Sequence, residues 1–218
     1  MNYHGNATVG GPALVRELTH LVITKLAVGP MNNNAYLLRC RATDEQLLLD
    51  AAAEPDRLLA LVGDDQLQQV LTTHQHRDHW TALAEVVVAT RAKTLAHEAD
   101  AVGIAVPTDS TVSDGATVMV GHVRLIARQL VGHTPGSLAL IYDDPAGHPH
   151  VWTGDCLFPG GVGNTNKDSE RFTSLLADVR TKIFDPLPDE TWVYPGHGDD
   201  TTLGAERPHL GEWAARGW

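Results

Sequence analysis

The stretch His74-Gln75-His76-Arg77-Asp78-His79 holds three histidines and an aspartate within six positions, directly after an apolar run and two threonines. Neutral imidazoles and carboxylates are ligands for zinc, iron or manganese. In an extended segment, His74, His76 and Asp78 would share one face and His79 would point elsewhere, which suits a second metal ion. Two ions with an exchangeable water between them would form a hydrolytic centre. The alternative is a polar loop that happens to contain histidines, and the partners of the motif downstream argue against it.

Three further residues of ligand type each lie at a turn marked by glycine or proline. They are His133 in Gly132-His133-Thr134-Pro135-Gly136-Ser137, Asp155 in Thr153-Gly154-Asp155, and His197 in Pro195-Gly196-His197-Gly198. Apolar, strand-like runs precede or follow these turns. A ligand on a strand-end loop is held rigidly by the sheet while its metal stays open to substrate. The complete set is five histidines and two aspartates.

In this order, the motifs His-x-His-x-Asp-His, Gly-His-Thr-Pro-Gly, Thr-Gly-Asp and Pro-Gly-His resemble those of the metallo-β-lactamase-fold hydrolase superfamily, and within it the short glyoxalase II-like subgroup. The resemblance runs from about Leu21 onward, and Asn33-Asn34-Ala35-Tyr36-Leu37 is similar to an early strand of glyoxalase II-like chains. Periodicity alone predicts only a mixed α/β fold. The resemblance implies a four-layer αββα sandwich, with an N-terminal arm at residues 1–20 and one domain at 21–218.

The resemblance also implies a role for each ligand-type residue. His74, His76 and His133 would bind a first ion, Asp78, His79 and His197 would bind a second, and Asp155 would bridge both. Asp78 and Asp155 are expected to be catalytic as well as metal-binding. We expect two divalent ions, with zinc as the first choice and iron or manganese as alternatives that such ligands also accept.

The charges of such a centre favour an anionic substrate. Two divalent ions carry four positive charges, and Asp78, Asp155 and a hydroxide carry three negative ones, so one positive charge remains. Coordination can lower the pKa of water to about 7, which gives a nucleophile at neutral pH. A thioester suits this site because its thiolate leaving group, with a pKa of about 8.5, needs little help from an acid. The expected reaction is therefore hydrolysis of a small hydroxyacyl thioester.

Composition limits the possible partners. A chain of 218 residues with 43% apolar content predicts one domain with a sizeable core, and a net charge of −11 argues against nucleic acid as the main partner. The two cysteines, Cys40 and Cys156, are expected to be reduced thiols of a cytoplasmic protein, with Cys156 in the core. Neither a signal peptide nor a membrane span is expected. The oligomeric state stays open.

The hydrophobic pattern places the motifs between regular elements. It predicts a loose arm at 1–20, a meander of strands at 20–28, 34–40 and 46–50, and a hairpin at 116–130 that turns at Gly121-His122. Further strands are expected at 70–73, 93–97, 138–142, 151–153 and 191–194. Helices are expected at 55–62, 80–90, 98–102 and 169–184, and at the C-terminus.

Substrate recognition is expected to come from loops around the metals, because the chain stops shortly after His197 and full-length glyoxalase II enzymes continue into a helical domain that contacts glutathione. The glycine-rich segment 158–167 could move over the site, and Lys167 could offer a cation to a substrate carboxylate. Trp80, beside the cluster, could line the pocket. The competing interpretations are a solvated lysine and a tryptophan of the core.

Three other functions remain open. A persulfide dioxygenase-like oxidoreductase would hold one iron at His74, His133 and Asp155. The segment Gly163-Asn164-Thr165-Asn166-Lys167 departs from the Gly-Arg-Thr-Asp-Phe pattern of those enzymes, and from the usual glyoxalase II pattern too. A metal-binding protein without turnover, or a β-lactamase, would be the remaining alternatives.

Overall fold

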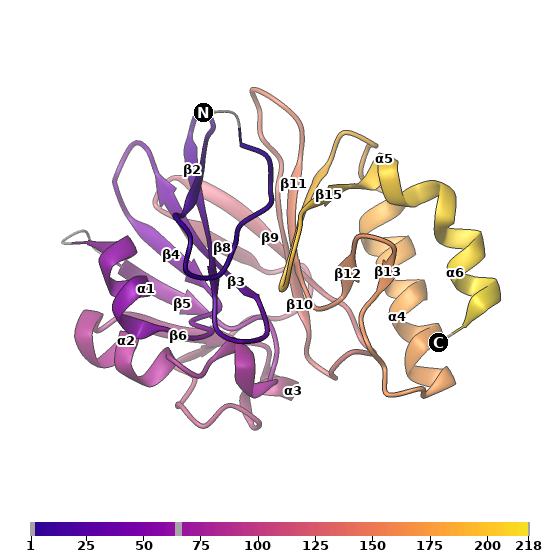
Figure 1. The fold of residues 1–218 in the computed structure, drawn as a ribbon, viewed down its shortest axis with the longest axis horizontal. Coiled ribbons are helices and arrows are strands. Elements are labelled where there is room, and N and C mark those ends of the chain that lie inside the picture. The colour runs from indigo at the N-terminus through magenta and orange to yellow at the C-terminus, as the bar shows by residue number, and fades with distance from the viewer. Residues whose placement is uncertain (1–2, 64–66, 218) are drawn as a thin grey trace.

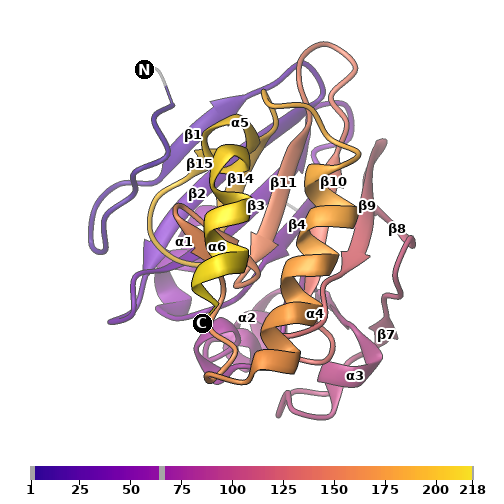
Figure 2. The ribbon, with the colours of Figure 1, turned by 90° about the vertical axis from the view of Figure 1, so that its right-hand side faces the viewer.

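Two β-sheets face each other and carry helices on their outer sides, in a computed structural model that describes residues 3–63 and 67–217 (Figure 1). The expected four-layer αββα arrangement is confirmed. α1 (Pro55–Val62) and α2 (Leu83–Thr90) cover the first sheet, and α4 (Ser169–Val179) and α6 (Leu210–Arg216) lie over the second (Figure 2). Short helices α3 (Glu98–Ala101) and α5 (Leu203–Glu206) and the 3-10 turns η1 (Arg77–His79) and η3 (Arg207–His209) are further helical elements of the described residues.

The first sheet has the strand order β1 to β7. Its strands are β1 (Leu14–Glu17), β2 (Leu21–Val28), β3 (Asn33–Cys40), β4 (Gln46–Leu49), β5 (Leu67–Leu71), β6 (Lys93–Ala96) and β7 (Ser110–Thr111). The pairs from β1 to β4 are antiparallel, so the predicted meander is confirmed, and the pairs from β4 to β7 are parallel. Parallel strands bring their carboxyl ends to one edge of a sheet, where sites in α/β folds usually lie.

The second sheet has the order β15-β14-β11-β10-β9-β8. Its strands are β8 (Thr117–Val120), β9 (Val123–Gln129), β10 (Leu138–Tyr142), β11 (His150–Gly154), β14 (Trp192–Pro195) and β15 (Thr201–Thr202). The hairpin predicted at Gly121-His122 is confirmed, because Val120 pairs with Val123. A separate small hairpin joins β12 (Leu157–Phe158) to β13 (Gly161–Val162).

Three apolar clusters separate the four layers. The middle cluster packs Ile23, Leu38 and Leu49 of the first sheet against Leu140 and Trp152 of the second. A second cluster lies under α1 and α2, and a third lies under α4 and α6. Alternate residues of β2 enter different clusters, as a strand buried on both faces requires.

Some local expectations were wrong. Residues 3–17 of the predicted arm are not loose, since β1 pairs with β2 and the Tyr3 ring packs edge-on against Trp192. The strand expected at 70–73 is β5, which ends at Leu71, and the helix expected at 80–90 begins only at Leu83. The long helix at 169–184 is confirmed, although its last five residues form a π-helix, η2 (Arg180–Phe184). Residues 1–2 of the arm and Trp218 lie outside the described residues.

Both cysteines are buried and free, and Cys156 lies in the third apolar cluster, as expected. Among the described residues, none of the helices combines the length and the apolar content needed to cross a bilayer.

Candidate metal centre

All seven predicted ligand residues meet at one end of the sandwich, where the loops after β5, β9, β11 and β14 come together. Their ligand atoms form three overlapping groups, in each of which the atoms lie within 4.8 Å of one another. The groups are His74, His76 and His133; Asp78, His79 and His197; and His74, His79 and Asp155. The first two match the division into two ions implied by the resemblance, and the third spans both.

The loop that carries the first motif is bent rather than extended. After β5 ends at Leu71, the chain bends and then forms the 3-10 turn η1, which contains Asp78 and His79. A 3-10 helix turns in about three residues, so it swings Asp78 and His79 back toward the bend. The ring centroids of His74 and His79 are 4.1 Å apart as a result.

In the first group, three imidazole nitrogens point at a common centre. His133 Nε2 lies 2.9 Å from His76 Nδ1 and 3.2 Å from His74 Nε2. His133 Nδ1 donates to the carbonyl oxygen of Asn164 at 2.8 Å, which leaves the Nε2 lone pair free to bind a metal. Burial, with His79 nearby, holds the pKa of His74 well below its usual value, so this ring is neutral, as a ligand must be.

The second group likewise brings three ligand atoms together, from two histidines and one aspartate. His79 Nε2 and His197 Nε2 are 3.1 Å apart, and Asp78 Oδ2 lies 3.4 Å and 3.3 Å from them. His197 Nδ1 donates to the carbonyl oxygen of Met31 at 2.9 Å. His79 Nδ1 lies 2.8 Å from Asp50 Oδ2, so both rings direct Nε2 toward the group.

Asp155 lies between the two groups. Its Oδ1 is 3.3 Å from His79 Nε2, and its Oδ2 is 3.6 Å from His133 Nε2 and 3.3 Å from His197 Nε2. Burial would raise the pKa of Asp155, but His79 and His197 hold it well below its usual value, so the carboxylate is charged. The approach of the His197 loop needs Gly196, because a Cβ there would lie 2.2 Å from Asp155 Oδ1.

The donor set fits two cations. Asp155 Oδ1 is buried and has no hydrogen-bond partner, which is rare for a charged oxygen. Nitrogen lone pairs 2.9–3.2 Å apart repel unless a proton or a metal ion lies between them. Burial alone would lower the pKa of His197, yet Asp155 and Asp78 raise it to about 9, which shows that the carboxylates favour positive charge here. The assignment of single residues to single ions stays a prediction.

Two acidic residues that the sequence analysis did not single out hold the ligand loops. Asp50, after β4, accepts from the Thr73 N–H at 2.7 Å and the Thr73 hydroxyl at 2.8 Å, besides its contact with His79. Asp100, in α3, accepts from the Gln75 N–H at 3.0 Å and the Gly136 N–H at 2.7 Å, and so links the loop of His74 to the loop of His133. Asp50 directly follows an apolar strand, and that position was its one signal in the sequence.

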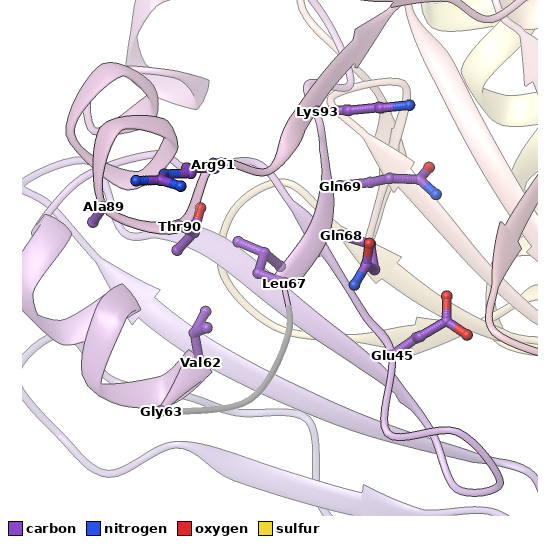
Figure 3. Close-up of a pocket in the computed structure, with 10 residues that line it drawn as sticks. All are labelled: Glu45, Val62, Gly63, Leu67, Gln68, Gln69, Ala89, Thr90, Arg91 and Lys93. Carbon is purple, nitrogen blue, oxygen red and sulfur yellow. The ribbon is translucent and has the colours of Figure 1, made fainter.

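A cavity of about 560 Å³ adjoins the first group. Its lining residues include His76, His133, Asn166 and Arg171. Arg171 also donates to the carbonyl oxygens of Gly132, at 2.8 Å, and His133. A second hollow of about 590 Å³ lies elsewhere, where β5 and β6 begin and α1 and α2 end, and its lining includes no ligand residue (Figure 3).

Neither of the two predicted substrate-binding residues, Lys167 and Trp80, is among the residues that line the 560 Å³ cavity. Lys167 is exposed, whereas its neighbour Asn166 does line the cavity. Trp80 is half-buried, packs against the cluster under α1 and α2, and donates from Nε1 to the Gln75 carbonyl oxygen at 2.9 Å. The segment expected to be a loop at 158–167 contains the β12–β13 hairpin, and the Phe158 ring lies 6.4 Å from the His197 ring.

Comparison with known sequences agrees with this geometry. A Hydroxyacylglutathione hydrolase from Polaromonas sp. is 34% identical over 180 residues, which cover 81% of this chain and 66% of that protein, so the chain spans about two thirds of its length. A protein of Bacillus subtilis named Probable metallo-hydrolase YqgX is 30% identical, and the match covers 84% of this chain and 93% of the relative.

Solved structures give the same fold. BLEG-1, described as a B3 metallo-beta-lactamase, superposes with a TM-score of 0.77 at 26% identity, covering 86% of this chain and 97% of its own. TTHA1623, solved in a di-iron-bound form, has a TM-score of 0.68 at 32% identity, and the match covers 84% of this chain and 96% of that chain. ETHE1 from Myxococcus xanthus has a TM-score of 0.76 at 29% identity, and the match covers 86% of this chain and 82% of that chain.

The family profile described as the Metallo-beta-lactamase superfamily matches residues 28–197, which include every predicted ligand. The chain therefore belongs to the metallo-β-lactamase superfamily.

Proposed function

We propose that this metallo-hydrolase family member is a dinuclear enzyme that cleaves a small, anionic thioester. The observation that supports the proposal most is the position of Asp155, whose carboxylate lies within 3.6 Å of histidines from both groups. Two divalent ions, with zinc as the proposed metal, would supply a water of low pKa and polarise the substrate carbonyl. The residues of the chain hold and orient that centre and shape the substrate cavity.

The cavity beside His76 and His133 is the proposed substrate site. It adjoins the first group, and Arg171 brings a guanidinium to its lining. A cationic lining and a centre with net positive charge both favour an anionic acyl or thiol portion. Because salt screens charges beyond a Debye length of about 8 Å, the local sign outweighs the acidic surface as a whole.

The relatives support a thioester substrate. The similar chain from Polaromonas sp. is named Hydroxyacylglutathione hydrolase. We propose the same reaction class here, with recognition of the thiol carrier by the loops around the centre, among them the segment 158–167 with Lys167 at its end. Trp80 would contribute by holding the loop of Gln75 and His76. The free, buried thiols of Cys40 and Cys156 support a cytoplasmic location.

A panel of thioesters tests the proposal. The panel holds one hydroxyacyl group constant and varies the thiol among glutathione, coenzyme A and a small mercaptan, with a β-lactam and an oxygen ester as comparison substrates. We expect turnover of the thioesters with a weak preference among thiols. Turnover of the β-lactam alone, or of none of the substrates by the metal-loaded protein, would contradict it.

A mononuclear iron persulfide dioxygenase is the second candidate, since His133 Nε2 lies 3.2 Å from His74 Nε2 and 3.6 Å from Asp155 Oδ2, which brings the three residues it would use together. Such an enzyme would bind its iron with His74, His133 and Asp155 only. The tight grouping of Asp78, His79 and His197 supports the dinuclear proposal instead. Oxygen consumption with a persulfide substrate and one iron per chain would decide for the second candidate.

A further inference from the structure

A lysine is buried between the two sheets beside the metal centre. Leu21 and Ile23 of β2 enter the apolar cluster between the sheets, and Lys25 follows on the same face with 0% exposure. Moving an ammonium group out of water is costly unless hydrogen bonds and an opposite charge replace its hydration. The partners of Lys25 therefore indicate what the residue does.

The three donor positions of the Lys25 ammonium are all used. Nζ donates to the carbonyl oxygens of Gly5, at 2.6 Å, and Gly198, at 2.7 Å, and to Asp200 Oδ1 at 2.7 Å. The side chains of Lys25 and Asp200 are 0% and 1% exposed. Burial lowers the pKa of Lys25 and raises the pKa of Asp200, and the opposite charge and hydrogen bond of each partner act against this desolvation cost.

Asp200 extends the same network to the N-terminal arm. Its Oδ2 accepts from the Tyr3 hydroxyl at 2.7 Å and from Trp192 Nε1 at 2.9 Å. Tyr3 and Gly5 thus contact the pair from the arm, while Trp192 starts β14, the strand that leads to His197. The arm, the first sheet and the second sheet meet at this one ion pair.

His197 lies within the segment that this network anchors. On one side, the carbonyl oxygen of Pro195 accepts from Asn34 Nδ2 at 2.9 Å and from the Tyr36 hydroxyl at 2.7 Å. On the other side, the carbonyl oxygen of Gly198 accepts from Lys25 and from Asn34 Nδ2. The backbone on both sides of His197 is therefore held by side chains of β2 and β3.

A buried ion pair usually contributes little net stability compared with a packed apolar pair, so stability is a weak explanation for Lys25 and Asp200. We propose that Lys25 and Asp200 are positioning residues that set His197 for the second metal ion, with Tyr3 and Gly5 of the arm completing the network. The proposal rests on the dinuclear centre of the proposed function. The first group is held separately, through Asp100.

Zinc release from the purified protein to a chromophoric chelator tests the proposal. In Lys25→Met, we expect one ion to be held as in the wild type and the other about tenfold to a hundredfold more weakly, the usual effect of removing a residue that orients a ligand. Asp200→Asn keeps the size of the side chain and one acceptor oxygen but removes the charge. This variant should therefore fold more readily than Lys25→Met, and it should weaken binding of the same ion by a smaller factor. Val179→Ala, in the third apolar cluster, is the control for general destabilisation and should hold both ions as the wild type does.

The affected ion is identified by adding His197→Ala. Since that substitution already removes a ligand of the second ion, Lys25→Met should have no further effect in its background. Wild-type affinities for both ions in Lys25→Met and Asp200→Asn would overturn the proposal, and so would an equal weakening of both ions that Val179→Ala reproduces. A wild-type protein that holds only one ion would contradict the dinuclear centre itself, and the proposal with it.

Discussion

Asp155 lies between the two halves of the centre, and its two oxygens face histidines of both groups. Asp155→Ala is expected to lower the content of both ions, whereas His76→Ala or His197→Ala should lower mainly one. Loss of a charged ligand shared by two cations should cost turnover more than loss of any one imidazole. Elemental analysis beside a thioester assay checks this. An Asp155→Ala protein with full metal content and turnover would remove the bridging role.

Asp50 is expected to act through His79. Asp50→Asn replaces the carboxylate that orients the His79 ring and holds Thr73, so the second ion should bind about tenfold to a hundredfold more weakly. Chelator competition measures the affinity. Asp56→Asn, an exposed change in the first turn of α1, is the matched control and should leave metal binding unchanged. Equal affinities in the two variants would show that Asp50 is not needed for His79.

The sequence predicted the metal-ligand residues better than it predicted the residues that hold the ligand loops in place. A dense run of histidines identifies a metal motif locally, because few other roles need such a run. Asp50, Asp100 and Lys25 carry no local signal of this kind, since each acts on residues more than 20 positions away. The bend before η1 has no local signal for a related reason: it depends on the contacts of Thr73 with Asp50 and of Gln75 with Asp100.

At the scale of elements, α3 links two ligand loops through Asp100. Asp100→Asn keeps one acceptor oxygen and turns an NH2 donor toward either the Gln75 N–H or the Gly136 N–H, so the link between the loops of His74 and His133 should loosen. We expect weaker binding of the first ion and little change in the second, which is the reverse of the effect expected for Lys25→Met. Glu98→Gln, exposed in the same helix, is the control. A loss confined to the second ion would contradict this division of supports.

The segment between β13 and α4 is expected to influence substrate binding. Lys167 is exposed there, so its charge should contribute about 1 kcal/mol or less, equivalent to about a fivefold rise in KM for acidic thioesters in Lys167→Ala, with kcat nearly constant. Steady-state kinetics with acidic and neutral thioesters separate the two constants. Lys93→Ala, exposed in the distant hollow of Figure 3, is the control. An equal effect on neutral substrates would argue against a charge contact.

Helices and strands were predictable from the sequence where the hydrophobic pattern and the turn residues agreed. The meander, the Gly121-His122 hairpin and the amphipathic helix at 169–184 have strong local signals. β1 was missed because its four residues alternate between half-buried and exposed positions, and pairing with β2 rather than propensity makes it a strand. The helix after the ligand motif begins late because η1 and the turn after it occupy residues 77–82.

At the scale of the whole molecule, stability should fall in acid partly through His150. Burial, with Arg16 and His148 nearby, lowers the pKa of His150 from 6.5 to about 3. The unfolded chain protonates His150 below about pH 6.5, while the folded protein keeps it neutral. The free energy of unfolding therefore falls as the pH drops from 6.5 toward 3. Thermal unfolding of wild type and His150→Gln across this range should show a shallower pH dependence in the variant. Parallel pH profiles would contradict this.

The sandwich as a whole brings four loops, far apart in sequence, to one end and leaves their ligand atoms facing each other. Elemental analysis of the protein purified without a chelator tests the central claim of a dinuclear centre most directly. We expect two metal ions per chain, mainly zinc. A single iron per chain, unchanged when zinc is supplied in excess, would contradict the dinuclear account and favour the mononuclear oxidoreductase.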